Sequence, residues 1–393
     1  GSGVFSLGHR DRKTCHTLKT ALDELDIGNH HLISRERGRL ASQLSMTLTF
    51  SLNGIFFGQV KKYHRIGWSD SRLENVTHTL QSIPQKFYCV FNVSASEAVD
   101  CAIKLARGVV GRNTIICANN AFHGCTGYAF AASAPAFTGN LAGQTLGFAH
   151  VPYGPIDAIA HELDNNTEVA AVLLEPIAIE SGCIIPPEGY LHNARELCHE
   201  RGALFIADES VTGLGRSGRK LSCAQQDAVP DIVVVGHALG GGVYPIYATC
   251  HREELDEFYV RNPFVHVSTF GGGEVGCAVA SEALSELSED WLLENVRDRG
   301  AEFRHAVAAI QRRGGTTVRA VRGIGLANAI ELDDVEACVK LQRLLFERGV
   351  FCRAALLAPQ TLLFLPPLTI TSEEIGFVVS AIESSLMVRW KSV

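Results

Sequence analysis

Residues 230–242 read PDIVVVGHALGGG, a β-branched apolar run that enters a glycine-rich turn. Such a run, bounded by turn residues, is typical of a buried strand. We interpret five runs of this kind as buried parallel strands: 88–92, 114–118, 169–174, 203–207 and 231–235. Helical patterns separate them, for example over 96–107 and 191–201. Strand–helix alternation over ~200 residues predicts an α/β fold with a mainly parallel sheet and helices on both faces.

The C-terminal part of the chain has a different pattern. Its expected elements are a strand over 319–332, a helix over 334–348, short strands near 350–353 and 362–365, and a helix over 372–387. They predict a smaller α+β domain. The expected organisation is an N-terminal segment (1–46), a large domain (47–290) and a small domain (291–393), with the boundary in a helix that runs through 284–293 into 300–312. Residues 47–86 show weak periodicity, and we treat them as an irregular or inserted segment.

The composition excludes several classes of protein. A net charge of -7 over 393 residues provides no basic patch for nucleic acid and no reason to expect an anionic membrane partner. No apolar run approaches the length of a membrane span, and we find no signal peptide. The 12 cysteines form no CxxC pair, so reduced thiols in a cytoplasmic protein are expected rather than a disulfide framework or a metal site.

Polar and aromatic residues follow the first two predicted strands. Ser94 and Glu97 have the spacing of a capping box, so a helix begins there. Its first N–H groups and its dipole form either a phosphate site or a plain helix cap. Phe122 and His123 precede Gly124 just past the second strand, which suits either stacking on a flat ring or a core aromatic.

Three further motifs each allow two interpretations. The fourth strand ends at Asp208, whose buried carboxylate needs a partner: a protonated pyridine nitrogen or the N–H groups of the next turn. His237 follows the fifth strand, at the edge where ligands bind in open α/β sheets, although it also suits a structural turn. Ser268 and Thr269 precede glycines, as in a phosphate-binding turn or a plain loop.

Together these motifs resemble the class III aminotransferases, fold-type-I enzymes that depend on pyridoxal phosphate (PLP). The resemblance runs from residues 7–9 to 366–368, over nearly the whole chain. It implies a large cofactor-binding domain with a mainly parallel sheet and a smaller C-terminal α+β domain. The order and separation of the motifs make it specific. The matching motifs are Ser96-Glu97-Ala98, Phe122-His123-Gly124, Glu175-Pro176-Ile177, Asp208-Glu209, residues 212–218 and 230–242, Ser268-Thr269-Phe270-Gly271-Gly272, and Arg322-Gly323-Ile324-Gly325-Leu326.

The resemblance implies a role for each matched residue. The backbone of Ala95 and Ser96 would hold the cofactor phosphate, Phe122 would stack on the pyridine ring and Asp208 would pair with its nitrogen. Thr269 would reach the phosphate of the partner subunit's cofactor, so a homodimer is expected. Glu175 and Glu180 would line the active site. The predicted cofactor-binding residues are Ser94, Ala95, Ser96, Phe122, His123, Glu175, Asp208, Val211, His237 and Thr269; the predicted catalytic residues are His237 and Asp208.

The main departure from the family pattern is His237, which stands where the family has its Schiff-base lysine. None of the other lysines obviously replaces it, and Lys220, the nearest in sequence, matches a loop position. Imidazole cannot form the stable imine, yet it can act as a general base near neutral pH. Sugar dehydratases of the same fold type use histidine at this position with the pyridoxamine (PMP) form.

Other departures concern the substrate and the cofactor ring. Leu363 stands where amino-acid-specific members place an arginine for the α-carboxylate, which argues against an ordinary α-amino acid or 2-oxoglutarate in the usual pose. Glu180 is therefore expected to lack its usual partner. Val211 replaces a polar partner of the phenolic oxygen, Ala95 replaces a glycine, and Gly273-Glu274 replaces Asn-Pro. The family's first several dozen residues are also expected to be missing.

These features predict a class III aminotransferase-like protein that binds PLP or PMP non-covalently. His237 would be the general base for a transferase or lyase reaction on a small carbonyl or amine substrate. Retention of Asp208, Phe122 and Thr269 favours this hypothesis. One alternative is an inactive homologue, a scaffold or sensor, which the combined losses favour. The other is a conventional aminotransferase with an engineered lysine-to-histidine change, which does not explain Leu363 or Val211.

Overall fold

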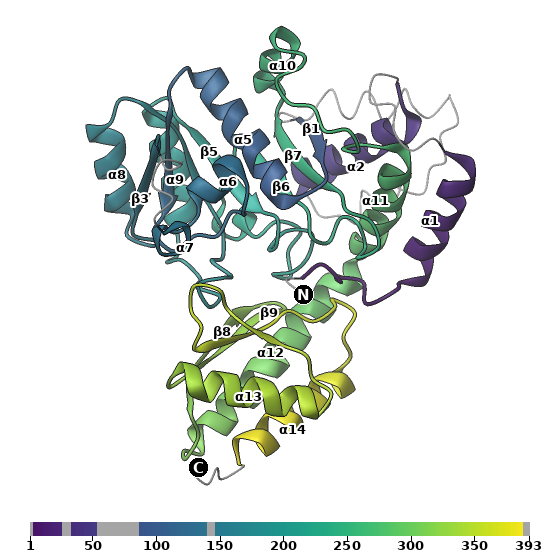
Figure 1. Cartoon of the computed structure of the whole chain (residues 1–393), viewed down its shortest axis with the longest axis vertical. Helices are drawn as coiled ribbons and strands as arrows, with labels where there is room; N and C mark the ends of the chain where they lie inside the picture. The colour runs from purple at the N-terminus through teal and green to yellow at the C-terminus, as the bar shows by residue number, and fades with distance from the viewer. Residues whose placement is uncertain (1–2, 26–32, 53–85, 140–145, 388–393) are drawn as a thin grey trace.

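The computed structural model describes residues 3–25, 33–52, 86–139 and 146–387. Figure 1 shows two parts stacked along the long axis, a larger α/β part and a smaller part beneath it. Residues near the N-terminus lie where the two parts meet, since Leu368 N–H donates to the Ser6 carbonyl.

A seven-stranded sheet forms the centre of the larger part, in the order β1-β7-β6-β5-β4-β2-β3. Four predicted parallel strands are confirmed, and β3 joins them in the same direction. The strands are β1 (Phe87–Asn92), β2 (Thr114–Ala118), β3 (Phe148–Val151), β4 (Val169–Leu174), β5 (Leu204–Glu209), β6 (Ile232–Val235) and β7 (Tyr247–Arg252).

The prediction for the first strand was wrong in its pairing. β1 forms, but its neighbour is β7, which runs antiparallel to it and also antiparallel to β6. The sequence pattern did not predict β7 at all. Because β1 is the edge strand of the sheet, only part of it is buried, unlike the fully buried β4 and β6.

Alternate residues of the strands enter two separate cores, as the side-chain period of a strand requires. In β6, Ile232 and Val234 pack in the core that contains α5 (Ala95–Val110). Val233 and Val235 pack in the core that contains α9 (Tyr190–Glu200). Helices therefore cover both faces of the sheet, as predicted. The other helical segments here are α6 (Gly127–Ala132), α7 (Pro135–Thr138), α8 (Ile156–Asn165), η3 (Cys223–Gln226), η4 (Glu253–Leu255) and α10 (Glu257–Arg261).

Three helices lie at the β1 end of the larger part: α2 (Arg35–Leu52) packs on β1, α11 (Glu274–Leu287) packs on α2, and α1 (Arg12–Glu24) packs on α11. α2 corrects the prediction of an irregular segment over 47–86, because residues 47–52 continue this helix. Leu44, Thr47 and Leu48 recur at helical spacing and are buried. The remainder of that predicted segment, 53–85, lies outside the described residues.

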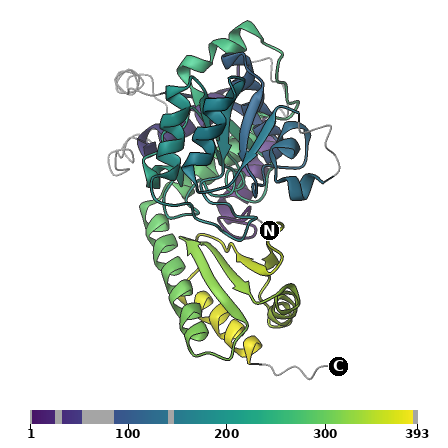
Figure 2. The ribbon, with the colours of Figure 1, turned by 90° about the vertical axis from the view of Figure 1, so that its left-hand side faces the viewer.

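The smaller part contains a four-stranded antiparallel sheet in the order β10-β11-β9-β8. Figure 2 shows α12 running down beside this sheet. The elements are α12 (Asp290–Arg312), β8 (Val318–Ile324), β9 (Ala327–Leu332), α13 (Val335–Glu347), β10 (Arg353–Ala354), β11 (Thr361–Phe364) and α14 (Ser372–Leu386).

Two predictions for this part were wrong. The single strand expected over 319–332 is a hairpin of β8 and β9, because Gly325 turns the chain with φ at 55°, a value that favours glycine. The continuous helix expected across the domain boundary is interrupted. α11 ends before Ser288, and extended backbone at Glu289 starts α12 in a new direction.

Arg216 connects both parts with the N-terminal segment. Its buried guanidinium donates to the carbonyls of Gly3, Leu326 and Pro366 and to the Ser6 hydroxyl. Burial lowers the pKa of this guanidinium to about 9. No described helix combines the length and the apolar character that crossing a bilayer requires.

Candidate active site

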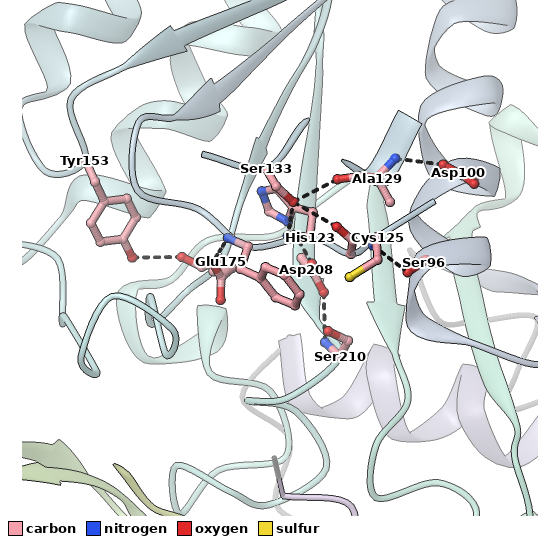
Figure 3. Close-up of polar contacts among 12 residues, drawn as sticks. Ser96, Asp100, His123, Cys125, Ala129, Ser133, Tyr153, Glu175, Asp208 and Ser210 are labelled. Carbon is pink, nitrogen blue, oxygen red and sulfur yellow. Dashed lines mark hydrogen bonds and ion pairs between the residues drawn. The ribbon is translucent and has the colours of Figure 1, made fainter. Parts of the chain in front are cut away.

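The predicted site residues lie at the carboxyl ends of neighbouring strands. Phe122 and His123 follow β2, Glu175 follows β4, Asp208 lies at the end of β5 and His237 follows β6. Because β2, β4, β5 and β6 are parallel, their carboxyl ends meet at one edge of the sheet. Figure 3 shows His123, Glu175 and Asp208 gathered in this region.

The phosphate end of the candidate site is the first turn of α5. Ser94 caps the helix, since its Oγ accepts from the N–H of Glu97 over 3.1 Å. The reciprocal bond differs from the predicted capping box, because the Glu97 carboxylate accepts from Val93 N–H rather than from Ser94 N–H. The N–H groups of Ala95 and Ser96 belong to the first turn, which has no acceptor within the helix. These donors, together with the helix dipole, suit an anion.

The loop after β2 packs directly on this turn. The N–H of Cys125 donates to the Ser96 hydroxyl over 3.0 Å. Gly124 makes the close approach possible, because a Cβ added there would lie 2.4 Å from Ser96 Oγ. The φ of Gly124 is 142°, which L side chains rarely adopt. The predicted Phe122-His123-Gly124 motif is therefore placed beside the predicted phosphate turn.

Asp208 has one partner in the following turn, as one of the two interpretations predicted, and a second partner, His123, that the sequence did not predict. One oxygen, Oδ1, accepts from Ser210 N–H in the following turn, over 3.1 Å. The other, Oδ2, lies 2.8 Å from Nδ1 of His123, and both side chains are buried. His123 therefore contacts the Asp208 carboxylate from within the protein interior. The backbone N–H of His123 donates to Ser133 Oγ over 2.9 Å, which fixes the histidine as well.

Glu209, the second carboxylate of the pair, has a different role. It is fully buried, its Oε2 accepts from the Thr212 hydroxyl and its Oε1 accepts from Cys223 N–H. These bonds hold the turn after β5. Because adjacent strand residues point to opposite faces, Asp208 and Glu209 enter different surroundings.

Glu175 is a buried carboxyl group beside Asp208. Burial raises its pKa well above the ordinary range, and the negative charges of Asp208 and Glu180 raise it further. Hydrogen bonds work in the opposite direction, and the clearest comes from Phe122 N–H over 2.9 Å. The raised pKa favours the neutral carboxyl, which can donate as well as accept a hydrogen bond.

Phe122 and Val211 each pack against other apolar side chains. The half-buried ring of Phe122 makes an edge-to-face contact with the half-buried ring of Phe137, with centroids 5.3 Å apart. Val211 is half-buried and packs in an apolar cluster that contains Leu363. Two of the predicted departures from the family pattern therefore share one cluster.

His237 lies next to the Asp208 turn. Its N–H donates to the Ser210 carbonyl over 2.9 Å, and its half-buried ring stands edge-on to Tyr247 with centroids 5.7 Å apart. Lys220, the nearest lysine in sequence, is buried elsewhere, and its ammonium donates to the Leu287 carbonyl. Lys220 is therefore directed away from the group around Asp208.

Within a single chain, Thr269 is a predicted site residue that has no hydrogen bond to the group around Asp208, among the residues that the structure describes. It is exposed, on a turn that packs against the end of β1 through Gly271, whose added Cβ would lie 2.3 Å from the Phe91 carbonyl oxygen.

Glu180, which was expected to lack its usual partner at position 363, has an ion-pair partner that the sequence did not predict. Arg353 forms a two-bond ion pair with its carboxylate, with Nη1 donating to Oε2 over 2.8 Å and Nη2 donating to Oε1. The prediction considered Leu363 alone. The sheet register places Arg353 directly opposite Leu363, on the neighbouring strand.

Several supporting residues had no signal in the sequence pattern. Ser133 Oγ donates to the Ala129 carbonyl, and Asp100 accepts from Ala129 N–H over 2.7 Å, so both hold α6 near His123. The Tyr153 hydroxyl donates to the Glu175 carbonyl over 2.8 Å (Figure 3). None of these side chains follows a predicted strand directly, so strand-end polarity does not reveal them.

Comparisons with known proteins agree with this arrangement. Residues 59–386 match the family model for class III aminotransferases. An uncharacterized aminotransferase from Archaeoglobus fulgidus is 38% identical over 376 residues, which span 96% of this chain and 80% of that protein. The ornithine aminotransferase of Toxoplasma gondii superposes with a TM-score of 0.83 at 27% identity, covering 98% of this chain and 85% of that one. The acetylornithine aminotransferase of Elizabethkingia anophelis gives 0.78 at 27% identity, covering 98% and 87%.

Proposed function

Because the chain belongs to the class III aminotransferase family, whose members are PLP-dependent transferases, we propose that it binds PLP or PMP without a covalent link. His237 then serves as the proton-transfer group, and the substrate is a small carbonyl or amine compound. The site lies at the carboxyl ends of β2, β4, β5 and β6.

The observation that carries the proposal is the buried Asp208, held by His123 on one oxygen and by Ser210 N–H on the other. A carboxylate has about four acceptor positions, so capacity remains for a further donor. A protonated pyridine nitrogen fits that position. The cofactor, when bound, supplies an electron sink at the substrate carbon, and a carboxylate beside its ring nitrogen keeps it so.

The opposite end of the site fits a phosphate group. Ser94 caps α5, and the N–H groups of Ala95 and Ser96 follow at the positive end of a 16-residue helix. Gly124 lets the loop that carries Phe122 approach this turn closely. Phe122 would lie against one face of the cofactor ring, while Asp208 holds its edge.

His237 would hold and move the proton at the substrate carbon. An imidazole exchanges protons near neutral pH, which suits a general base. Tyr247 and the Ser210 carbonyl fix the ring and the backbone of His237. A backbone anchored to the Asp208 turn keeps the base at a constant position relative to the carboxylate.

A homodimer forms part of the proposal, with Thr269 reaching the phosphate of the partner subunit's cofactor. Thr269 is exposed, and so are four large apolar residues on the same segment, a grouping that marks an interface. They are Val260, Phe264, Val267 and Phe270. A cytoplasmic location stays a prediction.

An inactive homologue is the second candidate function. The apolar cluster that joins Val211 to Leu363 favours it, because two polar positions of the family site have been replaced together. The same cluster argues against a conventional enzyme with only His237 engineered, since one change at residue 237 would leave both positions polar.

The test is an absorbance spectrum of the purified chain after incubation with PLP and, separately, with PMP. Acid release and mass spectrometry then identify what stays bound. Retained PMP, or PLP that leaves without breaking a bond to the protein, supports the proposal. Retention of neither cofactor contradicts it and favours the scaffold or sensor.

A further inference from the structure

Two thiols face each other at the edge of the large sheet. Cys89 of β1 lies directly opposite Cys250 of β7 in their antiparallel pair. The two Sγ atoms are 3.2 Å apart, which exceeds the length of an S–S bond by only about 1.2 Å. Rotation of the two side chains supplies a movement of this size. A disulfide between them therefore requires no change in the register of the strands.

The hydrogen-bond pattern of the strand pair also suits this link. Glu253 N–H donates to the Lys86 carbonyl over 3.0 Å, so these two residues form a hydrogen-bonded pair across the strands. Hydrogen-bonded and non-hydrogen-bonded pairs alternate along an antiparallel ladder. Cys89 and Cys250 are three positions further along, so theirs is a non-hydrogen-bonded pair. The Cα atoms of such a pair are about 4.5 Å apart, within the range of about 4.4–6.8 Å that a disulfide spans.

The two thiols differ in their access to solvent. Cys89 is half-buried, whereas Cys250 is fully buried in the core. Burial raises the pKa of the Cys250 thiol well above its ordinary value, and the neighbouring Cys89 raises it further. Because the thiolate is the nucleophilic form, a small oxidant that arrives from solvent reacts first with Cys89. Cys250 is then the second thiol, which closes the disulfide.

We propose that Cys89 and Cys250 form a modification site for peroxides, which convert the two thiols into a disulfide that fastens β1 to β7. This inference goes beyond the proposed function and does not depend on a bound cofactor. It is carried by the register that opposes the two residues and by the contact between their sulfur atoms.

The oxidation has two steps and balances with hydrogen peroxide as the electron acceptor. The Cys89 thiolate attacks one peroxide oxygen, the O–O bond breaks, and the products are a sulfenic acid on Cys89 and, after protonation, water. The Cys250 sulfur then attacks Sγ of Cys89. The S–O bond breaks, and hydroxide leaves with the Cys250 proton as a second water. Two electrons thus pass from the two thiols to the peroxide.

The disulfide fastens the strand that leads into the proposed phosphate turn. β1 is an edge strand, and among the described strands β7 is its only neighbour (Figure 1). β1 ends at Asn92, and Ser94 caps α5 just beyond it. The two cysteines are 161 positions apart, and a cross-link that closes a long loop restricts the unfolded chain strongly. Oxidation is therefore expected to stabilise this edge of the sheet.

Treatment of the full chain with hydrogen peroxide tests the proposal. Iodoacetamide blocks the remaining thiols, and mass spectrometry without reduction identifies the proteolytic peptides. The expected product is a pair of peptides joined through Cys89 and Cys250, which dithiothreitol separates. The midpoint of thermal unfolding should rise by about 5 °C on oxidation, and reduction should reverse the rise.

Three variants separate this site from general oxidation. Cys89→Ser should fold, because the position is only half-buried, and should show neither the joined peptides nor the rise. Cys250→Ala should leave Cys89 at the sulfenic acid, which dimedone labels. Cys15→Ser is the matched control, because Cys15 is also half-buried but lies in α1, and it should behave like the unsubstituted chain.

Two results overturn the proposal. One is the recovery of Cys89 and Cys250 in separate peptides, alkylated or oxidised beyond the sulfenic acid, after the peroxide has been consumed. The other is an equal rise in the unfolding midpoint of Cys89→Ser, because the rise then has a source other than this disulfide. Joined peptides with no rise in the midpoint of the unsubstituted chain overturn the stabilising role of the link.

Discussion

Nδ1 of His123 lies 2.8 Å from Oδ2 of Asp208, and both side chains are buried at the carboxyl end of the parallel sheet. Ser210 N–H holds the other oxygen of the same carboxylate. A buried carboxylate is costly unless it is hydrogen-bonded, and here the segments that follow β2 and β5 share that task. Asp208 is therefore oriented before any ligand arrives, as a preorganised site requires.

Replacing this carboxylate should weaken cofactor binding more than it weakens the fold. Asp208→Asn keeps the shape and one acceptor but removes the charge that a protonated pyridine nitrogen needs. We expect PLP affinity, measured by equilibrium dialysis, to fall roughly 10- to 100-fold, the loss of one charged hydrogen bond. Asp231→Asn is the matched control. Asp231 lies at the start of β6, at the opposite edge of the sheet from Asp208, where it accepts from Phe205 N–H and from Arg252. Equal affinity losses in both variants would contradict a cofactor contact at Asp208.

Glu175 should make the stability of the fold depend on pH. Its raised pKa means that the folded chain holds this proton more tightly than the unfolded chain does. Stability is therefore greatest below the ordinary value of 4.5 and is lost as the pH rises toward the folded-state pKa. Glu175→Gln removes this titration. The free energy of unfolding of the variant, relative to the parent, should rise by about 1.4 kcal/mol per pH unit across that window.

Urea unfolding at pH values from 5 to 8 measures this difference. Glu168→Gln provides the control, since Glu168 is exposed and its substitution should give a difference that is flat with pH. A flat difference for Glu175→Gln as well would show that Glu175 is ionised in the folded chain throughout this range.

The sequence best predicts strands that are completely buried and side chains whose position follows directly from such a strand. β4 and β6 are buried on both faces, so their β-branched runs were recognisable, and parallel topology then brings Asp208 and His237 to one edge. β7 was missed because its ends are only half-buried and its sequence, YATCHR, mixes polar and apolar residues without a clear period. The ion pair of Arg353 with Glu180 joins residues 173 positions apart and depends on the register of β10 with β11. No sequence period encodes such a register.

Gly124 should be intolerant of any side chain. Its φ of 142° is strained for alanine, and the new Cβ would lie 2.4 Å from Ser96 Oγ, in the turn proposed to hold phosphate. The strain alone costs about 1–3 kcal/mol. Gly124→Ala should therefore lower stability in thermal unfolding and also weaken PLP binding. Gly111→Ala, at the other end of α5, has φ at 71° and no described atom within 4 Å of the added Cβ, so it should lower stability alone. Unchanged PLP binding by Gly124→Ala would separate the loop from the phosphate site.

His237 provides the most direct test of how this chain departs from its family. If it fills the position of the Schiff-base lysine, His237→Lys places an amine beside the Asp208 turn, to which the residue 237 backbone is already bonded through Ser210. Borohydride treatment in the presence of PLP should then leave the cofactor attached to the denatured chain, at residue 237 by peptide mass spectrometry.

His237→Ala should still retain PLP or PMP, because Asp208 and the α5 turn are unchanged, but it should lose proton transfer. His192→Lys, at an exposed position, controls for nonspecific labelling. Specific attachment in the first variant with retention in the second supports histidine as a base in a working cofactor site. Cofactor binding by His237→Lys without attachment would mean that residue 237 does not reach the cofactor, and proton transfer would have to be assigned to another side chain near Asp208.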